Sequence, residues 1–190
     1  MVSVVINLIG SPSVGKSTTA AKLLAELKAR DLDVEMVQEI AKTWCLTGRA
    51  INKYDQYYLF GCECQNQSRL FGAVDFIVSD SSPILAAFYH NYYNGGDNSL
   101  VPACQEFYRK ATTDNVKVIN LLLPRKRKYV AKGRYQGAQE ADKVATLLRE
   151  WLDKEGFEYI ELDCPDKDRL DYILDIIRRE VGDFDGMSMV

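Results

Sequence analysis

The sequence has little of several features that would indicate particular protein classes. Its 190 residues include a single histidine, and no apolar run reaches the roughly 18 residues that a membrane-spanning helix requires. The net charge is −3, so the overall charge does not indicate nucleic-acid binding. The N-terminal stretch VSVVINLIG has neither a basic flank nor a cleavage site. We therefore expect one cytoplasmic domain without membrane contact.

Cysteines are too few and too scattered to indicate a disulfide framework. The chain has five, an odd number, which favours reduced thiols. Cys62 and Cys64 form a C-x-C pair, but there is no second pair, and the single histidine, His90, is distant in sequence. This pattern favours packed cysteines over a metal-thiolate site.

What the sequence does have is a regular alternation of apolar runs with longer segments of helical period. It predicts strands at 2–9, 33–38, 75–79, 115–123 and 157–162. It predicts helices near 16–30, 40–47, 53–71, 82–92, 99–111, 137–154 and 166–181. The order predicts a three-layer α/β fold, with a five-stranded parallel sheet and helices on both faces. We expect one domain over 1–182 and a flexible tail over 183–190.

A glycine-rich loop lies between the first predicted strand and the first predicted helix. Its spacing, Gly10-x-x-x-x-Gly15-Lys16-Ser17, is that of the phosphate-binding loop (P-loop, or Walker A). Backbone N–H groups at the start of the helix would bind phosphate oxygens, and the lysine would neutralise the β- and γ-phosphates. The residues predicted to bind the nucleotide here are Gly10, Ser13, Val14, Gly15, Lys16, Ser17 and Thr18.

A magnesium site follows from the same context. The Ser17 hydroxyl would supply one ligand, and Asp80, at the end of the apolar strand DFIVS, would supply a carboxylate through water. The alternative for Asp80 is a helix N-cap, because a helix is predicted near Ser82. Asp75 begins that strand, at the opposite edge of the sheet, and is predicted to be structural.

Glu39 ends the second predicted strand, at the edge of the sheet where ligands bind in such folds. A carboxylate at this position can accept a proton from an attacking hydroxyl, or orient that hydroxyl. Its alternative role is an exposed glutamate at a helix start, stabilised by the helix dipole. We predict that Lys16, Glu39 and Asp80 are catalytic.

An ordered set of motifs resembles one family. Val37-Gln38-Glu39-Ile40-Ala41-Lys42 matches its V-x-E-x-A-[RK] segment, Asp55-Gln56 its D-Q pair, and Gly133-Arg134-Tyr135-Gln136 its late G-R-x-Q segment. The chain looks like the P-loop kinases related to the ribosylnicotinamide kinase domain of NAD-salvage proteins. Phage-encoded ATPase-like kinases are also similar, and a phage origin would imply the host cytoplasm. The resemblance implies a nucleoside- or nucleotide-kinase-like fold.

Acceptor-side residues follow partly from this resemblance. Glu39 with Trp44 is similar to the E-P-x-x-x-W stretch of deoxynucleoside kinases, although the proline and the E-R-S or D-R motif are absent here. Gln56 and Gln65 would lie on the helix bordering the acceptor pocket, where amides can pair with a base. The tyrosines of that helix could stack on a ring, although aromatic residues at this spacing are more often core.

The segment 125–134, RKRKYVAKGR, carries six basic side chains in ten residues. It stands where related kinases carry a lid, which we place near 124–136. Arg125 and Arg127 are predicted to bind the nucleotide, and Arg134 to be catalytic, because arginines closing over the phosphates stabilise developing charge. The alternatives are a solvated basic loop or a contact with a nucleic-acid backbone.

We therefore expect a kinase that uses Mg²⁺ and ATP. The N-K-x-D sequence that would indicate guanine is absent, so ATP is the expected donor. A nucleoside- or nucleotide-like small molecule is the first candidate for the acceptor. A hydroxymethylated pyrimidine in DNA is the second, with DNA held by the basic segment 125–134. A P-loop ATPase or switch that acts on a protein partner is the third; the sequence leaves the oligomeric state open.

Overall fold

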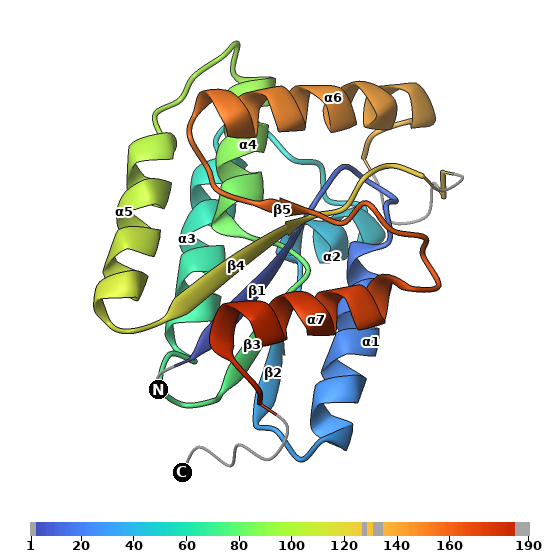
Figure 1. The fold of residues 1–190 in the computed structure, drawn as a ribbon. Helices are drawn as coiled ribbons and strands as arrows, with labels where there is room; N and C mark the ends of the chain where they lie inside the picture. Colours follow the sequence, from blue (N-terminus) through green and yellow to red (C-terminus); the bar gives the residue numbers. More distant parts are fainter. Residues whose placement is uncertain (1–2, 127–128, 131–134, 185–190) are drawn as a thin grey trace.

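The computed structural model describes residues 3–126, 129–130 and 135–184. It contains a five-stranded parallel sheet with strand order β2-β3-β1-β4-β5 (Figure 1). The strands are β1 Val4–Ile9, β2 Val34–Val37, β3 Phe76–Ser79, β4 Lys117–Leu122 and β5 Ile160–Glu161. The strand that leads into the glycine-rich loop, β1, is therefore central, between β3 and β4. The predicted fold class is confirmed.

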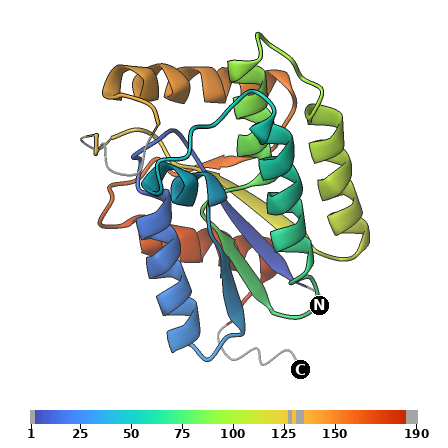
Figure 2. The same cartoon turned by 180° about the vertical axis from the view of Figure 1, so that it is seen from behind.

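Seven helices are present within the described residues. They are α1 Lys16–Ala29, α2 Ile40–Leu46, α3 Asp55–Ser68, α4 Pro83–Tyr93, α5 Val101–Thr113, α6 Ala138–Lys154 and α7 Arg169–Val181. Figures 1 and 2 show α1 and α7 on one face of the sheet and α3, α4 and α5 on the other. The long helix α6 crosses one end of the molecule, beyond the carboxyl ends of the strands.

The two faces of β1 pack into different clusters because successive side chains point to opposite sides of a sheet. Val4, Ile6 and Leu8 are fully buried against residues of α1 and α7. On the other face, Ile9 packs with residues of α4, α5 and α6. The strand is apolar on both faces because helices cover both of them.

One polar residue is buried in β1. Asn7 is 0% exposed, donates to Asn120 Oδ1 at 2.9 Å, and accepts from Gln67 Nε2 at 2.8 Å. Gln67 belongs to α3, so this bond fixes that helix to the central strand. Buried amides are tolerated where they are hydrogen-bonded in this way.

Two sequence-based boundaries are wrong. Of the predicted strand at 157–162, only Ile160 and Glu161 pair with β4. Phe184, which was predicted to lie in a flexible tail, is fully buried with its ring 5.5 Å from that of Phe76. An apolar ring so close to the sheet is driven out of water, and the periodicity of a short segment does not reveal that. Within the described residues, no helix is long and apolar enough to span a membrane.

Candidate active site

The glycine-rich loop between β1 and α1, which we call the phosphate loop, has the backbone that its sequence predicts. A Cβ at Gly10 would lie 2.9 Å from the carbonyl oxygen of Leu123 and from Cγ2 of Val14, so only glycine fits there. Gly15 has φ 98° and Ser13 has φ 67°, both in the left-handed region. The loop is thus a tight turn that ends at the positive end of α1, where anions bind.

Lys16 is the first residue of α1, and its side chain folds back over the loop. Its Nζ atom donates to the carbonyl oxygens of Gly10 at 2.8 Å and Ser11 at 3.3 Å. The ammonium therefore lies directly above the amides that would hold phosphate oxygens. Of the other predicted nucleotide-binding residues, Val14 is buried and Thr18 is exposed in the first turn of α1.

A buried arginine braces the same loop from the far end of the sequence. Arg169 begins α7, is 2% exposed, and donates from Nη1 to the Val14 carbonyl and to Thr19 Oγ1, at 3.3 Å each. It also pairs with Asp166. Sequence analysis missed this residue, because a lone arginine at a helix start carries no signal of burial.

Ser17, the predicted magnesium ligand, contacts one charged side chain, and Asp80, the other predicted ligand, is buried at the end of β3. Lys42 Nζ on α2 donates to Ser17 Oγ at 3.0 Å. Asp80 is 2% exposed, and its Oδ1 accepts the backbone N–H of Glu39 at 2.9 Å, which fixes the start of α2 to the end of β3. Asp80 does not cap α4, because Ser82 is the N-cap of that helix and no side-chain cap bond is present.

Oxygen ligands of this kind suit magnesium, which prefers hydroxyl, carboxylate and water oxygens. In the described part of the chain, no group of three or more His, Cys, Asp and Glu side chains is arranged to hold a metal ion. Ser17 and Asp80 would therefore share such an ion with phosphate oxygens and water. This coordination is what a nucleotide-bound Mg²⁺ requires.

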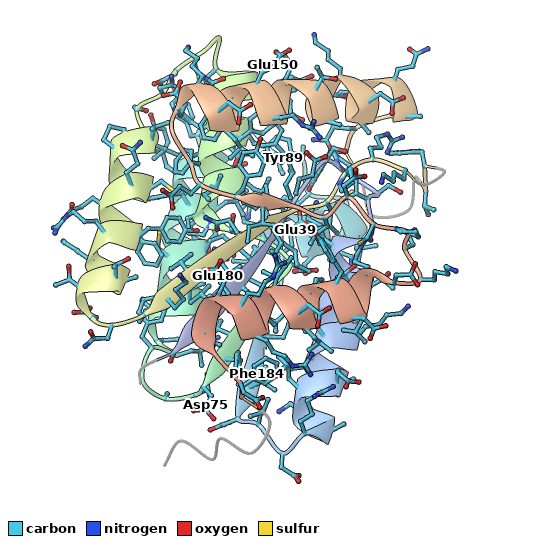
Figure 3. All side chains as sticks on the ribbon, viewed as in Figure 1. Glu39, Asp75, Tyr89, Glu150, Glu180 and Phe184 are labelled. Carbon is cyan, nitrogen blue, oxygen red and sulfur yellow. The ribbon has the colours of Figure 1, made fainter. Side chains whose placement is uncertain are left out.

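A cavity of about 420 Å³ opens next to the phosphate loop. Lys16 and Pro12 line one end, and Glu39 and Lys42 lie beside them. The wall comes from α3 and α4, and the cover from residues 135–136 and the start of α6. Figure 3 shows Glu39 and Tyr89 between α6 and the carboxyl ends of the strands, whereas Asp75 lies at the opposite end of the sheet. Glu39 is thus placed between the phosphate loop and the cavity.

The cavity wall contains two buried polar side chains from α3. Gln56 is 3% exposed and Glu63 is 2% exposed, and both line the cavity. The pKa of Glu63 is raised to about 8, mainly by burial; the carboxylates of Glu39 and Asp80 also raise it, whereas hydrogen bonds with Ser81 and the backbone of Ile40 lower it. Sequence analysis missed Glu63, because the sequence does not show which face of α3 packs against the rest of the fold.

Two predicted acceptor residues lie outside the cavity. Gln65 is on the exposed face of α3 and is not among the lining residues. Trp44 is half-buried; its ring stacks on Tyr58 at 5.6 Å, and the Arg49 guanidinium lies 3.4 Å from its centroid. Neither side chain faces the cavity: the pattern identified the helices, but not the faces that they turn toward it.

The segment after β4 contacts both the phosphate loop and the wall of the cavity. Arg125 Nη1 donates to the Pro12 carbonyl at 3.1 Å and pairs with Asp142, while the Val130 N–H donates to Ser13 Oγ at 2.8 Å. On the acceptor side, Gln136 Nε2 donates to Tyr93 Oη at 2.6 Å. Arg127 and Arg134 lie outside the described residues.

A second cavity, of about 260 Å³, lies on the other side of the phosphate loop. Thr18, Thr19 and Lys22 of α1 line it together with residues 166–167 and 169–171. It adjoins the loop DCPDKD, residues 163–168, which leads into α7. This second cavity therefore lies between the first turns of α1 and α7.

Comparison with solved structures identifies proteins that share this fold. The solved structure of the NadR protein in complex with NR has a TM-score of 0.65 at 17% identity and covers 95% of this chain. Deoxyadenosine kinase from M. mycoides, with dCMP and dCDP, has a TM-score of 0.59 at 13% identity, covering 92% of this chain and 99% of that one. APS kinase CysC from Mycobacterium tuberculosis has a TM-score of 0.52 at 10% identity, covering 93% and 97%.

These likenesses establish the fold. The chain spans about half (51%) of the NadR structure that it matches. No curated protein sequence matches significantly. A family model, AAA_28, described as an AAA domain, matches residues 5–169. With that match over most of its length, and with the fold of P-loop kinases, the chain belongs to the AAA_28 family.

Proposed function

We propose that this protein is a kinase that transfers the γ-phosphoryl group of Mg-ATP to a hydroxyl of a nucleoside-like acceptor. One observation carries the proposal: a single cavity begins at Lys16 of the phosphate loop, passes Glu39, and ends among buried polar and aromatic side chains of α3 and α4. Its volume, about 420 Å³, is within the range of small-molecule sites. The NadR structure contains NR, and the deoxyadenosine kinase structures contain nucleotides, which supports this acceptor class.

The donor side would work through charge and position. Backbone amides of the phosphate loop hold the phosphates, and Lys16 neutralises the β- and γ-oxygens. Ser17 and Asp80 would hold Mg²⁺, whose charge offsets the charge that develops on the phosphoryl group. Lys42 places a second ammonium beside Ser17. Arg125, Arg127 and Arg134 are the proposed lid arginines, and the adenine would occupy the second cavity.

Glu39 is the proposed base on the acceptor side. It is half-buried and lines the cavity, and its backbone N–H is held by Asp80 at 2.9 Å. A carboxylate that lines the same cavity as Lys16 can accept the proton of an attacking hydroxyl, or orient that hydroxyl for in-line transfer. Gln56 is the proposed contact for a heterocyclic base, because its side chain is 3% exposed and lines the cavity.

A hydroxymethylated pyrimidine in DNA is the second candidate acceptor. The observation that favours it is an exposed aromatic face on α3, where Tyr54 is 67% and Tyr58 is 58% exposed. Lys53 Nζ lies 4.9 Å from the Tyr54 ring centroid, which gives the face a positive charge. Exposed rings with nearby cations are the elements that stack and hold single-stranded nucleic acid.

One experiment tests both candidates. The protein is incubated with γ-labelled ATP and Mg²⁺, with a panel of nucleosides in one set of reactions and DNA containing hydroxymethylated pyrimidines in another. Label on a nucleoside supports the proposed function, and label retained on DNA favours the second candidate. Release of free phosphate alone, unaffected by any acceptor, contradicts both and favours a partner-dependent ATPase.

A further inference from the structure

The α3 helix turns one stripe of side chains toward the interior. Gln56, Leu59 and Glu63 are spaced by three and four residues, which places them on the same face of a helix, and all three line the cavity. Gln67 continues the stripe and is fully buried. The stripe therefore holds three buried polar residues, which is unusual for a helix face that packs into a protein core.

Two of these residues have different surroundings. Gln67 donates to Asn7 of β1 at 2.8 Å and does not line the cavity, so its role is structural, although its Oε1 atom is also buried without a partner within the described residues. Glu63 is 2% exposed, and its Oε2 atom is fully buried with no hydrogen-bond partner within the described residues. Leaving a buried polar atom unpaired destabilises a fold. A buried carboxyl of this kind, lining a cavity, is typical of a group whose partner is a ligand.

The neighbours of Glu63 place it close to the reacting end of the cavity. Its carboxyl interacts with Ser81, the residue after Asp80, and with the backbone of Ile40, the residue after Glu39. The group bound by Glu63 would therefore lie near the hydroxyl that Glu39 holds. A second contact so close to the reacting atom fixes the orientation of the acceptor as well as its position.

We propose that Glu63 is a positioning residue that hydrogen-bonds a second polar group of the acceptor, adjacent to the hydroxyl that receives the phosphate. This inference rests on the proposed function, and it narrows the substrate class. The acceptor carries two neighbouring hydrogen-bonding groups, as the sugar of a nucleoside does with its hydroxyls. A site that hydrogen-bonds a hydroxyl discriminates against an analogue lacking it.

The test compares Glu63→Met, which removes the hydrogen bonds, with Glu63→Gln, which keeps the shape and an amide. Glu150→Gln is the control, because it makes the same chemical change at an exposed position of α6 outside the cavity. Each protein is assayed with γ-labelled ATP and a panel of ribonucleosides and their 2′-deoxy and 3′-deoxy analogues. Thermal unfolding of each protein is measured without ligand.

We expect Glu63→Met to raise the acceptor KM by about 10- to 100-fold, the effect of leaving a buried hydrogen bond unmade. The KM for ATP should stay within about twofold, since ATP is held by other residues. Wild-type protein should also discriminate against one deoxy analogue, and Glu63→Met should lose that discrimination. Glu63→Gln should fall between the two, and Glu150→Gln should match wild type.

Stability separates this role from a structural one. If Glu63 serves a ligand, replacing it by methionine removes a buried carboxyl whose Oε2 atom has no partner within the described residues, and raises the unfolding midpoint by about 2–4 °C. A lowered midpoint in both Glu63 variants, or unchanged acceptor KM and discrimination, overturns the inference. Wild-type protein that labels no nucleoside contradicts the proposed function instead. The thermal shift then decides the role of Glu63: a rise supports a ligand-facing carboxyl, and a fall overturns it.

Discussion

The two sides of the site are built differently. On the donor side, the phosphate loop relies on backbone amides, one glycine that no other residue can replace, and a lysine that folds over the loop. On the acceptor side, the cavity is lined by side chains from the start of α2, from α3 and α4, and from the segment that leads into α6. The phosphate loop occupies one short stretch of sequence, whereas the cavity is assembled from stretches that are distant in sequence. The same phosphate loop can therefore serve kinases with many different acceptors, whereas the side chains that line the cavity must change with each acceptor.

Removing the lysine should have the largest effect on the donor side. We expect Lys16→Ala to lower turnover by at least about 100-fold, because the charge opposite the β- and γ-phosphates is lost. Its fold should be retained, because the side chain is only half-buried. Transfer of label from ATP measures the loss, and circular dichroism checks the fold. Wild-type activity in this variant would show that the phosphate loop is not the donor site.

Substitution of Glu39, the proposed base, should have the next largest effect on turnover. Glu39→Gln should lower kcat by about 100-fold or more, since an amide cannot accept the proton. Binding of ATP, measured by calorimetry, should change little. An equal loss of ATP affinity and turnover would instead indicate a structural role for the Glu39 side chain.

The bracing arginine tests whether the donor side depends on more than its own loop. Arg169→Met removes the hydrogen bonds to Val14 and Thr19 and the ion pair with Asp166. We expect a loss of about 1–3 kcal/mol in the free energy of unfolding, and weaker ATP binding. Urea denaturation measures the first and calorimetry the second. Arg109→Met, at an exposed pair on α5, is the control, and a similar result for both would remove the special role of Arg169.

The smallest expected effect is on the acceptor KM, and it should differ between two glutamines of α3. Gln56→Ala should raise the acceptor KM by about tenfold, because a buried amide facing the ligand is lost. Gln65→Ala should leave it unchanged, because Gln65 is exposed and outside the cavity. Steady-state kinetics with the best nucleoside of the panel checks both. The reverse order would mean that the acceptor binds on the outer face of α3.

Features encoded in one short stretch could be predicted from the sequence, and features assembled from distant stretches could not. The order of strands and helices, the phosphate loop and the position of Glu39 at a strand end all come from local patterns, and the structure has them. Gln65, Trp44 and Phe184 were misplaced because each depends on which face of an element meets the rest of the chain. Glu63 and Arg169 were missed for a related reason: a charged residue in a helix reads as solvent-exposed until the packing around it is known.

The bracing of the phosphate loop by Arg169 has a consequence for biosynthesis. The loop is complete as covalent structure once residue 17 has been made, but its support comes from the start of α7, about 150 residues later. The two strands that flank β1, namely β3 and β4, are also translated long after it. The proposed nucleotide site is therefore fully braced only after translation has passed α7 and that helix has left the ribosome. Helix α7 thus supplies the last support of a loop made near the start of synthesis.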